Sequence, residues 1–518
     1  MTNPPLGRRR FLALGVGFLS MIVGRARATE TQSRTGPILG KSQPFSFEWL
    51  IDHARGLAQR PYVHTPPRAA ELIKSIDFDA VQKIKFRTSC GLWNGRHFPI
   101  RFFHLNKFVN EPVTLHAVQG GEARPIVYSK DCFEFGNSNL ERMLPEDLGF
   151  SGFRVMDGPD SETDWLAFQG ASYFRSSGES GQYGASARGI AVDTAMPQPE
   201  EFPRFSQFWL QEEENSRSVT IFALLEGPSL TGAYRFEARR GSGAVMDAHA
   251  ELFIRKDIER LGVAPLTSMY WYAENASSRP DWRPEIHDSD GLAIWTSSGE
   301  RLWRPLTNPT RVLTNSFVDR DPKGFGLLQR DRDFNDYQDD GAFYNKRPSI
   351  WIEPIGSWGE GAVQLVQIPT DDEIHDNIVA YWTPKDIPKT GAHLAYKYRL
   401  HWQDDEPYPP NLARVVATRI GRGGVPGQPV PEHRWKFVID FEGGPLSNMR
   451  QRYDVKPIVT ASRGDVENAY SIKVVGTQRW RGFFDLNAEH GEPVELRCYL
   501  RLGDQTLSET WTYEMLLG

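Results

Sequence analysis

The chain has 518 residues, a formal net charge of -6 and 39% hydrophobic residues. This length and composition predict two or more domains with apolar cores and exclude global disorder. The balance of 60 Lys and Arg against 66 Asp and Glu argues against nucleic-acid binding as the main function, because phosphate binding needs clustered cations. Aromatic residues make up 12% of the chain, which suits large β cores or surfaces that stack on sugar rings.

The N-terminus predicts export. Three arginines at 8–10 precede Phe11 and Leu12, an apolar stretch and the small-x-small triplet at 26–28. We interpret residues 1–28 as a signal peptide, and the paired arginines before Phe-Leu favour the twin-arginine route over the ordinary Sec route. The expected location is the periplasm, with no transmembrane segment in the mature chain.

The three cysteines are Cys90, Cys132 and Cys498. An odd and sparse set does not make a disulfide framework. One bridge is compatible with the count, but we favour buried or semi-buried thiols. Because no CxxC motif or Cys/His cluster indicates zinc, we assign no metal ligand and no cofactor.

The pattern of apolar residues predicts an all-β protein with a short helical start. Helical spacing predicts a helix within 45–59 and another short helical stretch within 69–86. Short segments rich in β-branched and aromatic residues then alternate with turn residues, which predicts a large antiparallel β domain. The clearest of these segments are 113–118, 218–224 and 250–254.

The chain is predicted to divide into two β domains. The acidic, proline-rich segment 404–412 is typical of a linker. It separates a larger domain, 38–403, from strand-like runs in 413–518 that suggest an immunoglobulin-like β-sandwich. Within the larger domain, the long connections 273–291 and 318–350 exceed what a scaffold needs, and such loops often carry sites.

Small residues interleave with Tyr and Arg in 170–175 and again in 183–189. This pattern fits a groove wall where small side chains let a ligand approach while Tyr and Arg contact it. It also fits a tight β-hairpin with a Gly-rich turn. A serine hydrolase is not expected, because no G-x-S-x-G elbow is present.

A loop at 271–291 combines aromatics, carboxylates and a histidine between turn residues. It could line a site, or it could be a solvated acidic loop in which Asp288 and Asp290 cap turns. Calcium binding is a further option, although the acidic spacing of an EF-hand is absent.

Alternating Arg and Asp at 330–333 precede Tyr344, Arg347 and Trp351. Such alternation usually forms a surface ion network. Beside Tyr and Trp it could equally form a wall that hydrogen-bonds hydroxyls and stacks on pyranose rings.

Five ionisable side chains occupy the six positions 371–376. Crowded carboxylates cannot all ionise freely, so at least one should have a raised pKa, as a general acid requires. The alternative is a helix N-terminus with Thr370 as the N-cap. The residues alone do not choose among Asp371, Asp372 and Asp376.

Acidic groups, stacking aromatics and hydroxyl-binding Arg, Asn and Gln together suit a carbohydrate site, and glycosidic cleavage needs one protonated and one ionised carboxyl. Rossmann, P-loop and metallohydrolase patterns are absent.

From about residue 40 to the C-terminus, the chain resembles the family of osmoregulated periplasmic glucan biosynthesis proteins G and D, and the twin-arginine signal favours the D type. The motifs that carry the resemblance, in chain order, are Gly170–Arg175, Tyr183–Gly189, Arg283–Gly291, Leu302–Leu306, Lys323–Arg330, Arg347–Pro354 and Pro369–Asn377.

The resemblance implies a large galactose-mutarotase-like β-sandwich, a small immunoglobulin-like domain, and β-1,2-glucan as substrate. Some family members are similar to inverting endo-β-1,2-glucanases. By position, Asp376 would be the general acid and Asp288 the general base, acting on water through an extended relay. Tyr344 and Arg347 would line that relay or the cleft. The sequence departs from the family pattern in loops such as 339–343, and these departures bear on subsite preference.

The motifs supply the side chains that we expect to bind sugar. These are Tyr173, Arg175, Tyr183, Arg188, Trp271, Glu285, His287, Asp290, Trp303, Arg330, Trp351 and Glu353.

The leading hypothesis is hydrolysis that controls the structure of the glucan backbone. The alternative is a non-catalytic factor that binds nascent glucan and guides its assembly beside an inner-membrane glucan synthase. A mutarotase or epimerase would need a His/Glu pair at the anomeric centre, and the candidate motifs offer His287 and His375.

Overall fold

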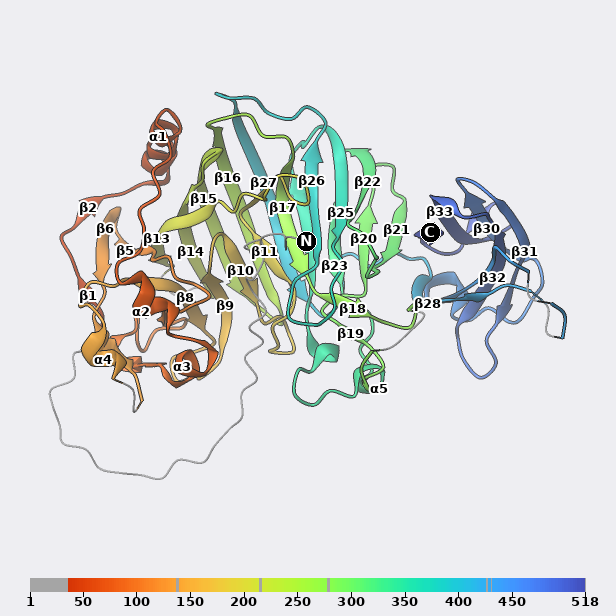
Figure 1. Cartoon of the computed structure of the whole chain (residues 1–518), viewed down its shortest axis with the longest axis horizontal. Helices are drawn as coiled ribbons and strands as arrows, with labels where there is room; N and C mark the ends of the chain where they lie inside the picture. Colours follow the sequence, from red (N-terminus) through yellow and green to blue (C-terminus); the bar gives the residue numbers. More distant parts are fainter. Residues whose placement is uncertain are drawn as a thin grey trace, which may run out of the picture.

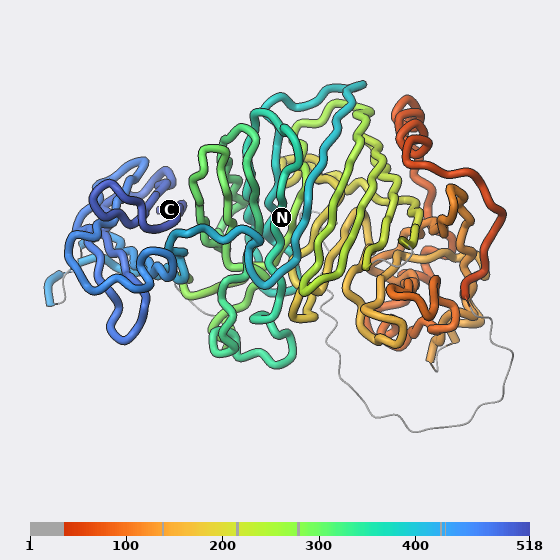
Figure 2. The backbone as a smooth tube through the Cα atoms, turned by 180° about the vertical axis from the view of Figure 1, so that it is seen from behind, coloured from red at the N-terminus to blue at the C-terminus, as the bar shows by residue number. Residues whose placement is uncertain are grey.

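The computed structural model describes residues 36–136, 139–213, 217–276, 280–424, 427–429 and 431–517. The predicted signal peptide, residues 1–28, lies outside these ranges. The predicted all-β fold is confirmed: two sheets form a large domain, with short helices at one end of the molecule and a smaller β domain at the other (Figures 1 and 2). Within the described ranges, no helix is both long and apolar enough to cross a membrane.

One layer of the large domain is an antiparallel sheet in the order β22-β25-β26-β17-β11-β10-β9-β8-β4, with β12 also paired to β17. Its strands are β4 (Ile100–His104), β8 (Phe150–Met156), β9 (Asp164–Gln169), β10 (Tyr173–Ser176), β11 (Ser186–Arg188), β12 (Ile190–Val192), β17 (Leu261–Ser268), β22 (Leu313–Arg320), β25 (Glu360–Gln367) and β26 (Ile378–Pro384).

The second layer runs from β6 through β5, β13, β14, β15, β16, β27, β24, β23 and β20 to β21. These strands are β5 (Thr114–Gln119), β6 (Glu122–Val127), β13 (Arg204–Glu212), β14 (Ser218–Glu226), β15 (Leu230–Arg240), β16 (Ala244–Ile254), β20 (Gly291–Trp295), β21 (Arg301–Pro305), β23 (Gly324–Leu328), β24 (Ser349–Ile355) and β27 (His393–Gln403).

The C-terminal domain has two sheets, β28-β29-β32-β31 and β30-β33-β35 with β34 on β33. The bounds are β28 (Arg414–Arg422), β29 (Arg434–Glu442), β30 (Val455–Ala461), β31 (Asp465–Lys473), β32 (Trp480–Asn487), β33 (Gly491–Leu502), β34 (Gln505–Thr506) and β35 (Thr510–Leu517).

The remaining elements are short. They are β1 (Ile38–Leu39), β2 (Gln43–Pro44), β3 (Lys85–Phe86), β7 (Phe133–Glu134), β18 (Tyr270–Tyr272), β19 (Ile286–His287), α1 (Phe47–Ala58), α2 (Ala70–Lys74), α3 (Phe78–Lys83), α4 (Leu140–Met143), α5 (Phe334–Tyr337), η1 (Thr88–Cys90), η2 (Lys130–Cys132), η3 (Tyr344–Lys346) and η4 (Gly444–Leu446).

Aromatic side chains join the two layers of the large domain. Phe168 on β9 lies 5.6 Å from Phe208 and 5.5 Å from Phe236 on the facing sheet, measured between ring centroids. Burying rings of this size removes large apolar areas from water and stabilises the sandwich. The high aromatic content therefore supplies core residues first.

The predicted helix within 45–59 is α1, capped by Ser46, whose side chain accepts a hydrogen bond from the Trp49 N–H. Leu50 and Ala54 bury its apolar face against the outside of the second sheet. The helical stretch within 69–86 is two short helices, α2 and α3, because the side chain of Asp77 caps a second start.

The strands expected at 113–118, 218–224 and 250–254 are confirmed as β5, β14 and part of β16. The prediction of a long irregular connection at 318–350 is wrong, because this segment contains β23, a buried strand between β20 and β24. A Cβ atom on Gly324 would lie 2.5 Å from the ring of Trp351. Glycine weakens the strand pattern in the sequence, but here it makes room for the tryptophan.

The two β domains are joined by hydrogen-bonded strands. β21 pairs in parallel with β35, so one run of paired strands crosses from the large domain into the small one. The segment 404–412 has no helix or strand, yet Glu406 within it is 2% exposed and pairs with Arg301 at 2.8 Å.

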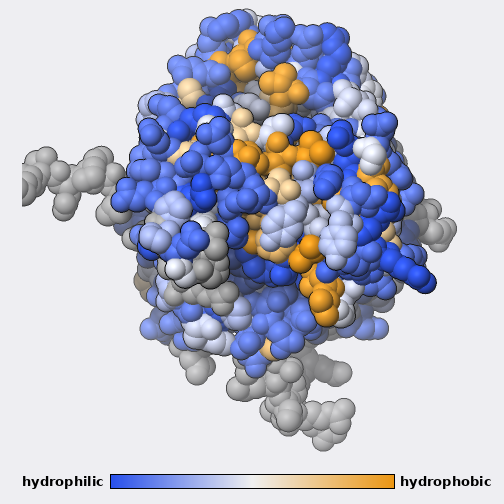
Figure 3. Space-filling view, turned by 90° about the vertical axis from the view of Figure 1, so that its right-hand side faces the viewer, coloured by the Kyte–Doolittle hydropathy of each residue, from blue (hydrophilic) through white to orange (hydrophobic). Residues whose placement is uncertain are grey.

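The free end of the C-terminal domain carries apolar side chains on an otherwise polar surface (Figure 3). Ile472 on β31 and Val475 just after it are exposed. β31 is the edge strand of its sheet.

Cys90 and Cys132 form a disulfide, with their Cα atoms 5.6 Å apart, so the interpretation of these two as thiols is wrong. Pairing of β3 with β7 brings the two cysteines, which are 42 residues apart in the sequence, close to each other. Cys498 is a buried free thiol, as predicted.

We predict that replacing both Cys90 and Cys132 by serine lowers the free energy of unfolding by about 3–4 kcal/mol, because the bridge restricts a 42-residue loop of the unfolded chain. Urea denaturation followed by circular dichroism measures the change. Reductant should lower the midpoint of the wild type but leave that of the double variant unchanged. Equal midpoints for the two oxidised proteins would contradict the prediction.

Candidate active site

Arg347 lies at the centre of the candidate site. Its guanidinium forms an ion pair with Asp288, and its central carbon lies 4.1 Å from the ring centroid of Tyr344. The Arg347 and Asp288 side chains are 12% and 7% exposed. Burial lowers the pKa of Arg347 to about 10, although Glu373 and Asp376 act in the opposite direction. The arginine remains a cation at neutral pH, so the Asp288 carboxylate faces a fixed positive charge.

Asp288 reaches Arg347 because of its place after the β18–β19 pair. Its N–H donates to the carbonyl oxygen of Met269 at 2.8 Å, which fixes the backbone. Neighbouring side chains in extended backbone point to opposite sides. His287 therefore turns inward to Gln329, while Asp288 meets the arginine.

Gly184 gives Arg347 its room. A Cβ atom at Gly184 would lie 2.8 Å from the Cβ atom of Arg347. We expected small residues in this motif to let a ligand approach. At Gly184 the missing side chain leaves room for Arg347 instead. The Gly-rich motif 183–189 thus positions the arginine against β11.

Asp376 lies in a bent segment just before β26, and its side chain is partly buried. Burial raises its pKa to about 6, although Arg188, Arg175 and Arg347 lower it. The expected raised pKa is confirmed, but the expected cause, crowding by neighbouring carboxylates, is wrong.

The alternative of a helix N-terminus at Thr370 is also wrong. Residues 370–377 contain no helix, and the Thr370 hydroxyl donates to the carbonyl oxygen of Asp372 at 2.9 Å in a local turn. The buried side chain of Asn377 instead anchors the segment, because it exchanges two hydrogen bonds with the backbone of Tyr270, at 2.8 and 2.9 Å.

Strands β10 and β11, with the connection between them that carries Tyr183, bring two Tyr–Arg pairs toward Asp376. The Arg188 guanidinium lies 4.8 Å from the Tyr173 ring centroid, and that of Arg175 lies 5.0 Å from Tyr183. Burial raises the pKa of both tyrosines, so their hydroxyls stay protonated. Arg188 is itself oriented by Glu200, at 2.7 Å.

A second acidic group borders the site and was missed by sequence reasoning. Arg283 donates to Glu373 at 3.0 and 3.1 Å and to Asp339 at 2.7 Å. The Tyr344 hydroxyl also donates to Glu373. The position of Glu373 within the acidic run 371–376 was a signal, but nothing local shows that its partner is Arg283.

Several predicted sugar-binding residues lie elsewhere, at the junction of the two domains. The Arg330 guanidinium lies 3.7 Å from the ring centroid of Trp303 and donates two hydrogen bonds to the Glu509 carboxylate, at 2.6 and 3.1 Å. Asp290 accepts the N–H groups of Arg330 and Asp331 at 2.8 and 3.0 Å. These contacts hold the C-terminal domain rather than surround Asp376.

Three expected sugar contacts are wrong because the side chains are enclosed. Trp351 is 1% exposed and covers Gly324, Trp303 is 4% exposed beneath Arg330, and His287 is 0% exposed.

The other predicted binders vary in exposure. Glu285 is buried against His287, at 3.1 Å. Glu353 accepts from His401 and Tyr408, at 3.1 and 3.0 Å. Trp271 is half-buried, edge-on to Tyr272.

Comparison with known proteins agrees with this architecture. Residues 45–515 match the family model described as "Periplasmic glucan biosynthesis protein, MdoG". The chain belongs to this family. It is 48% identical to "Glucans biosynthesis protein D 2" of Ralstonia nicotianae, over 98% of this chain and 97% of the relative.

Two further relatives are similar over most of their length. The chain is 47% identical to "Glucans biosynthesis protein D" of Stenotrophomonas maltophilia, over 92% of this chain and 90% of the relative. It is 45% identical to the protein of the same name in Xanthomonas oryzae pv. oryzae, over 92% and 91%.

In this member of the glucan biosynthesis family, the four predicted catalytic side chains share one neighbourhood. Asp288 and Tyr344 contact Arg347 directly, and Asp376 is close enough to Arg347 for each to influence the pKa of the other. Residues nearly 90 positions apart in the sequence are thus linked by one guanidinium.

We predict that Asp376→Asn raises the free energy of unfolding at pH 7.5 by about 1–3 kcal/mol. The folded state holds a proton on Asp376 up to about pH 6, while the unfolded chain releases it near its ordinary pKa. The ionised group therefore costs stability as pH rises through this window, and the difference between variant and wild type should vanish below about pH 4. Urea denaturation at several pH values tests this, and a less stable variant at pH 7.5 would contradict it.

Proposed function

We propose that this protein acts in periplasmic glucan biosynthesis by hydrolysing β-1,2-glucan within the chain, with inversion, and so controls the structure of the glucose backbone. Family membership and the names of the relatives support the process and its periplasmic location. We further propose export by the twin-arginine route. The catalytic part of the proposal is based on the Arg347 neighbourhood, where Asp288 is paired with a cation and burial raises the pKa of Asp376 to about 6.

Asp376 is proposed as the general acid. A pKa of about 6 leaves a useful fraction protonated near neutral pH while keeping the proton easy to transfer. An inverting glycosidase needs such an acid to protonate the leaving oxygen.

Asp288 is proposed as the general base. Its carboxylate is paired with Arg347, and its 7% side-chain exposure prevents direct contact with a bulky sugar. We therefore propose that it receives the proton of the attacking water through a relay bordered by Tyr344 and Arg347.

The Tyr–Arg pairs on β10 and β11 are proposed to bind the glucan beside Asp376. The protonated Tyr173 can donate to a sugar hydroxyl, whereas the Tyr183 hydroxyl donates to Asp164 and its ring orients Arg175. Arg175 and Arg188 present fixed N–H groups.

We predict that Asp376→Asn and Asp288→Asn each reduce the rate of cleavage of linear β-1,2-glucan by about 10²–10⁴-fold, as expected for loss of proton transfer. Chromatography of the oligosaccharide products measures the rate. Asp371→Asn is the matched control, because this exposed carboxylate lies in the same segment and should retain wild-type activity.

Absence of cleavage by the wild type, together with glucan binding by both the wild type and Asp376→Asn, would favour the non-catalytic assembly factor instead. That alternative also expects Asp376→Asn to restore normal glucans in cells that lack the native gene.

The pH profile gives a further prediction. The value of kcat/KM should fall about tenfold per pH unit above roughly pH 6, where Asp376 loses its proton. Arg188→Met removes a cation that lowers this pKa, so it should move the alkaline limb to higher pH even if it weakens binding. The shift is measured from the rate of glucan cleavage at roughly pH 4–9, which covers both limbs of the profile. A shift to lower pH would contradict the assignment.

A further inference from the structure

A second cluster of ionisable groups lies behind the candidate active site. Glu285, His287 and Asp331 each direct one ligand atom toward the others, and these atoms lie within 4.8 Å of one another. We propose that these three side chains form a binding site for one divalent transition-metal ion, with Zn²⁺ the best fit. The proposal does not depend on glucan hydrolysis.

The hydrogen bonds of His287 prepare it as a ligand. The Gln329 amide N–H₂ donates to the carbonyl oxygens of His287 and Tyr344, at 3.0 and 3.1 Å. Its amide oxygen must therefore accept from His287 Nδ1, at 2.9 Å. This leaves Nε2 pointing at Glu285, at 3.1 Å. Metal-binding histidines usually have one ring nitrogen held in this way while the other binds the ion.

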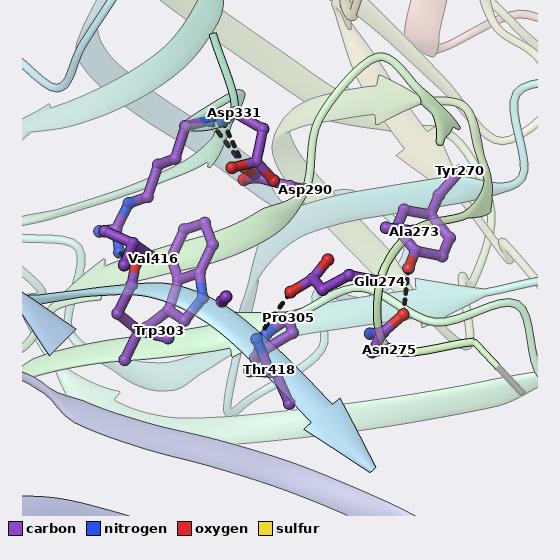
Figure 4. Close-up of a pocket in the computed structure, with 13 residues that line it drawn as sticks. Tyr270, Ala273, Glu274, Asn275, Asp290, Trp303, Pro305, Asp331, Val416 and Thr418 are labelled. Atoms are coloured by element: carbon purple, nitrogen blue, oxygen red, sulfur yellow. Dashed lines mark hydrogen bonds between the residues drawn. The ribbon is translucent and has the colours of Figure 1, made fainter. Parts of the chain in front are cut away.

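Carboxylate oxygens in the cluster lack partners. Among the described residues, none donates a hydrogen bond to the side chain of Asp331, and Asp290 Oδ1 is buried without a partner. Figure 4 shows the Asp290 and Asp331 carboxylates together at one side of the cavity. Buried polar atoms are nearly always paired, so the unpaired Asp290 Oδ1, beside the partly exposed Asp331 carboxylate, points to a missing cation.

The nearby Arg330 guanidinium is already engaged by other carboxylates. It is paired with Glu509 at 2.6 Å and lies 3.8 Å from Glu406. Glu285 and Asp331 bring two carboxyl groups within 4.8 Å of each other, and Asp290 and Glu274 line the adjoining cavity, so like charges gather here and repel one another. A divalent cation would relieve this repulsion.

A cavity of about 320 Å³, counted with its open mouth, reaches the cluster at Asp331, one of the three proposed ligands. Asp290, Asp331 and Glu274 line it from the large domain, and Thr418 lines it from the small domain (Figure 4). An ion and its water could therefore reach Asp331 from the junction between the domains.

The donor set favours Zn²⁺ over the alternatives. One imidazole nitrogen and two carboxylates match the ligand types of three-ligand zinc sites, which keep a fourth position for water. Calcium prefers six to eight oxygens, and magnesium retains most of its water. The ion would tie β19 to the segment after β23, directly behind Asp288 and Arg347.

The test uses the full chain, stripped of metal with a chelator and titrated calorimetrically with Zn²⁺ alone. We expect one ion per wild-type chain, and at least tenfold weaker binding by Asp331→Asn and by Glu285→Gln. Glu274→Gln is the matched control: its carboxylate lines the same cavity but is not a proposed ligand, and its affinity should stay within twofold of the wild type.

Folding is checked without metal by circular dichroism and thermal unfolding. Asp331→Asn removes a repulsive buried charge, so its Tm should not be lower than that of the wild type, and Zn²⁺ should raise the Tm of the wild type but not of Asp331→Asn. If Asp331→Asn does not fold, Glu285→Gln decides. The proposal is overturned if the wild type binds no Zn²⁺ or if the two ligand variants bind like the wild type. It is also overturned if Glu274→Gln loses as much affinity as they do, since binding would then follow cavity charge rather than coordination.

Discussion

The buried ion pair between Arg347 and Asp288 sets the geometry on which the candidate site depends. Two charges removed from water are stable together only when both are well paired, so each fixes the other. Gly184 leaves space for the stem of the arginine, and Tyr344 supports its planar head. Asp376 lies within the electrostatic reach of the same guanidinium, so one side chain acts on both carboxyl groups.

Sequence patterns predicted the all-β class, helix α1 and strands such as β5 and β14, because each depends on local periodicity. They missed β23, where glycine lowers the local strand signal but is required beneath Trp351. They also misjudged Cys90 and Cys132, because the pairing of β3 with β7 that joins them is a long-range event.

The candidate site was predictable by motif but not by arrangement. The motifs mark the important segments, yet they mix side chains of two separate clusters. Asp288 and His287 are adjacent in sequence, but one meets Arg347 and the other meets Gln329. Burial, rather than the crowding visible in 371–376, raises the pKa of Asp376, and burial is a property of the packed molecule.

The parallel pairing of β21 with β35 has a consequence for how the protein can be divided. A chain cut within 404–412 would expose the unpaired backbone groups of β21 along an open strand edge, a surface prone to aggregation. It would also leave the Arg330 guanidinium without its ion-pair partner, Glu509. Trp303 and Trp351 of the large domain also pack in the apolar core of the small one, so neither half would be a self-sufficient module. A fragment for crystallisation or fusion would need to keep β21 and β35 together.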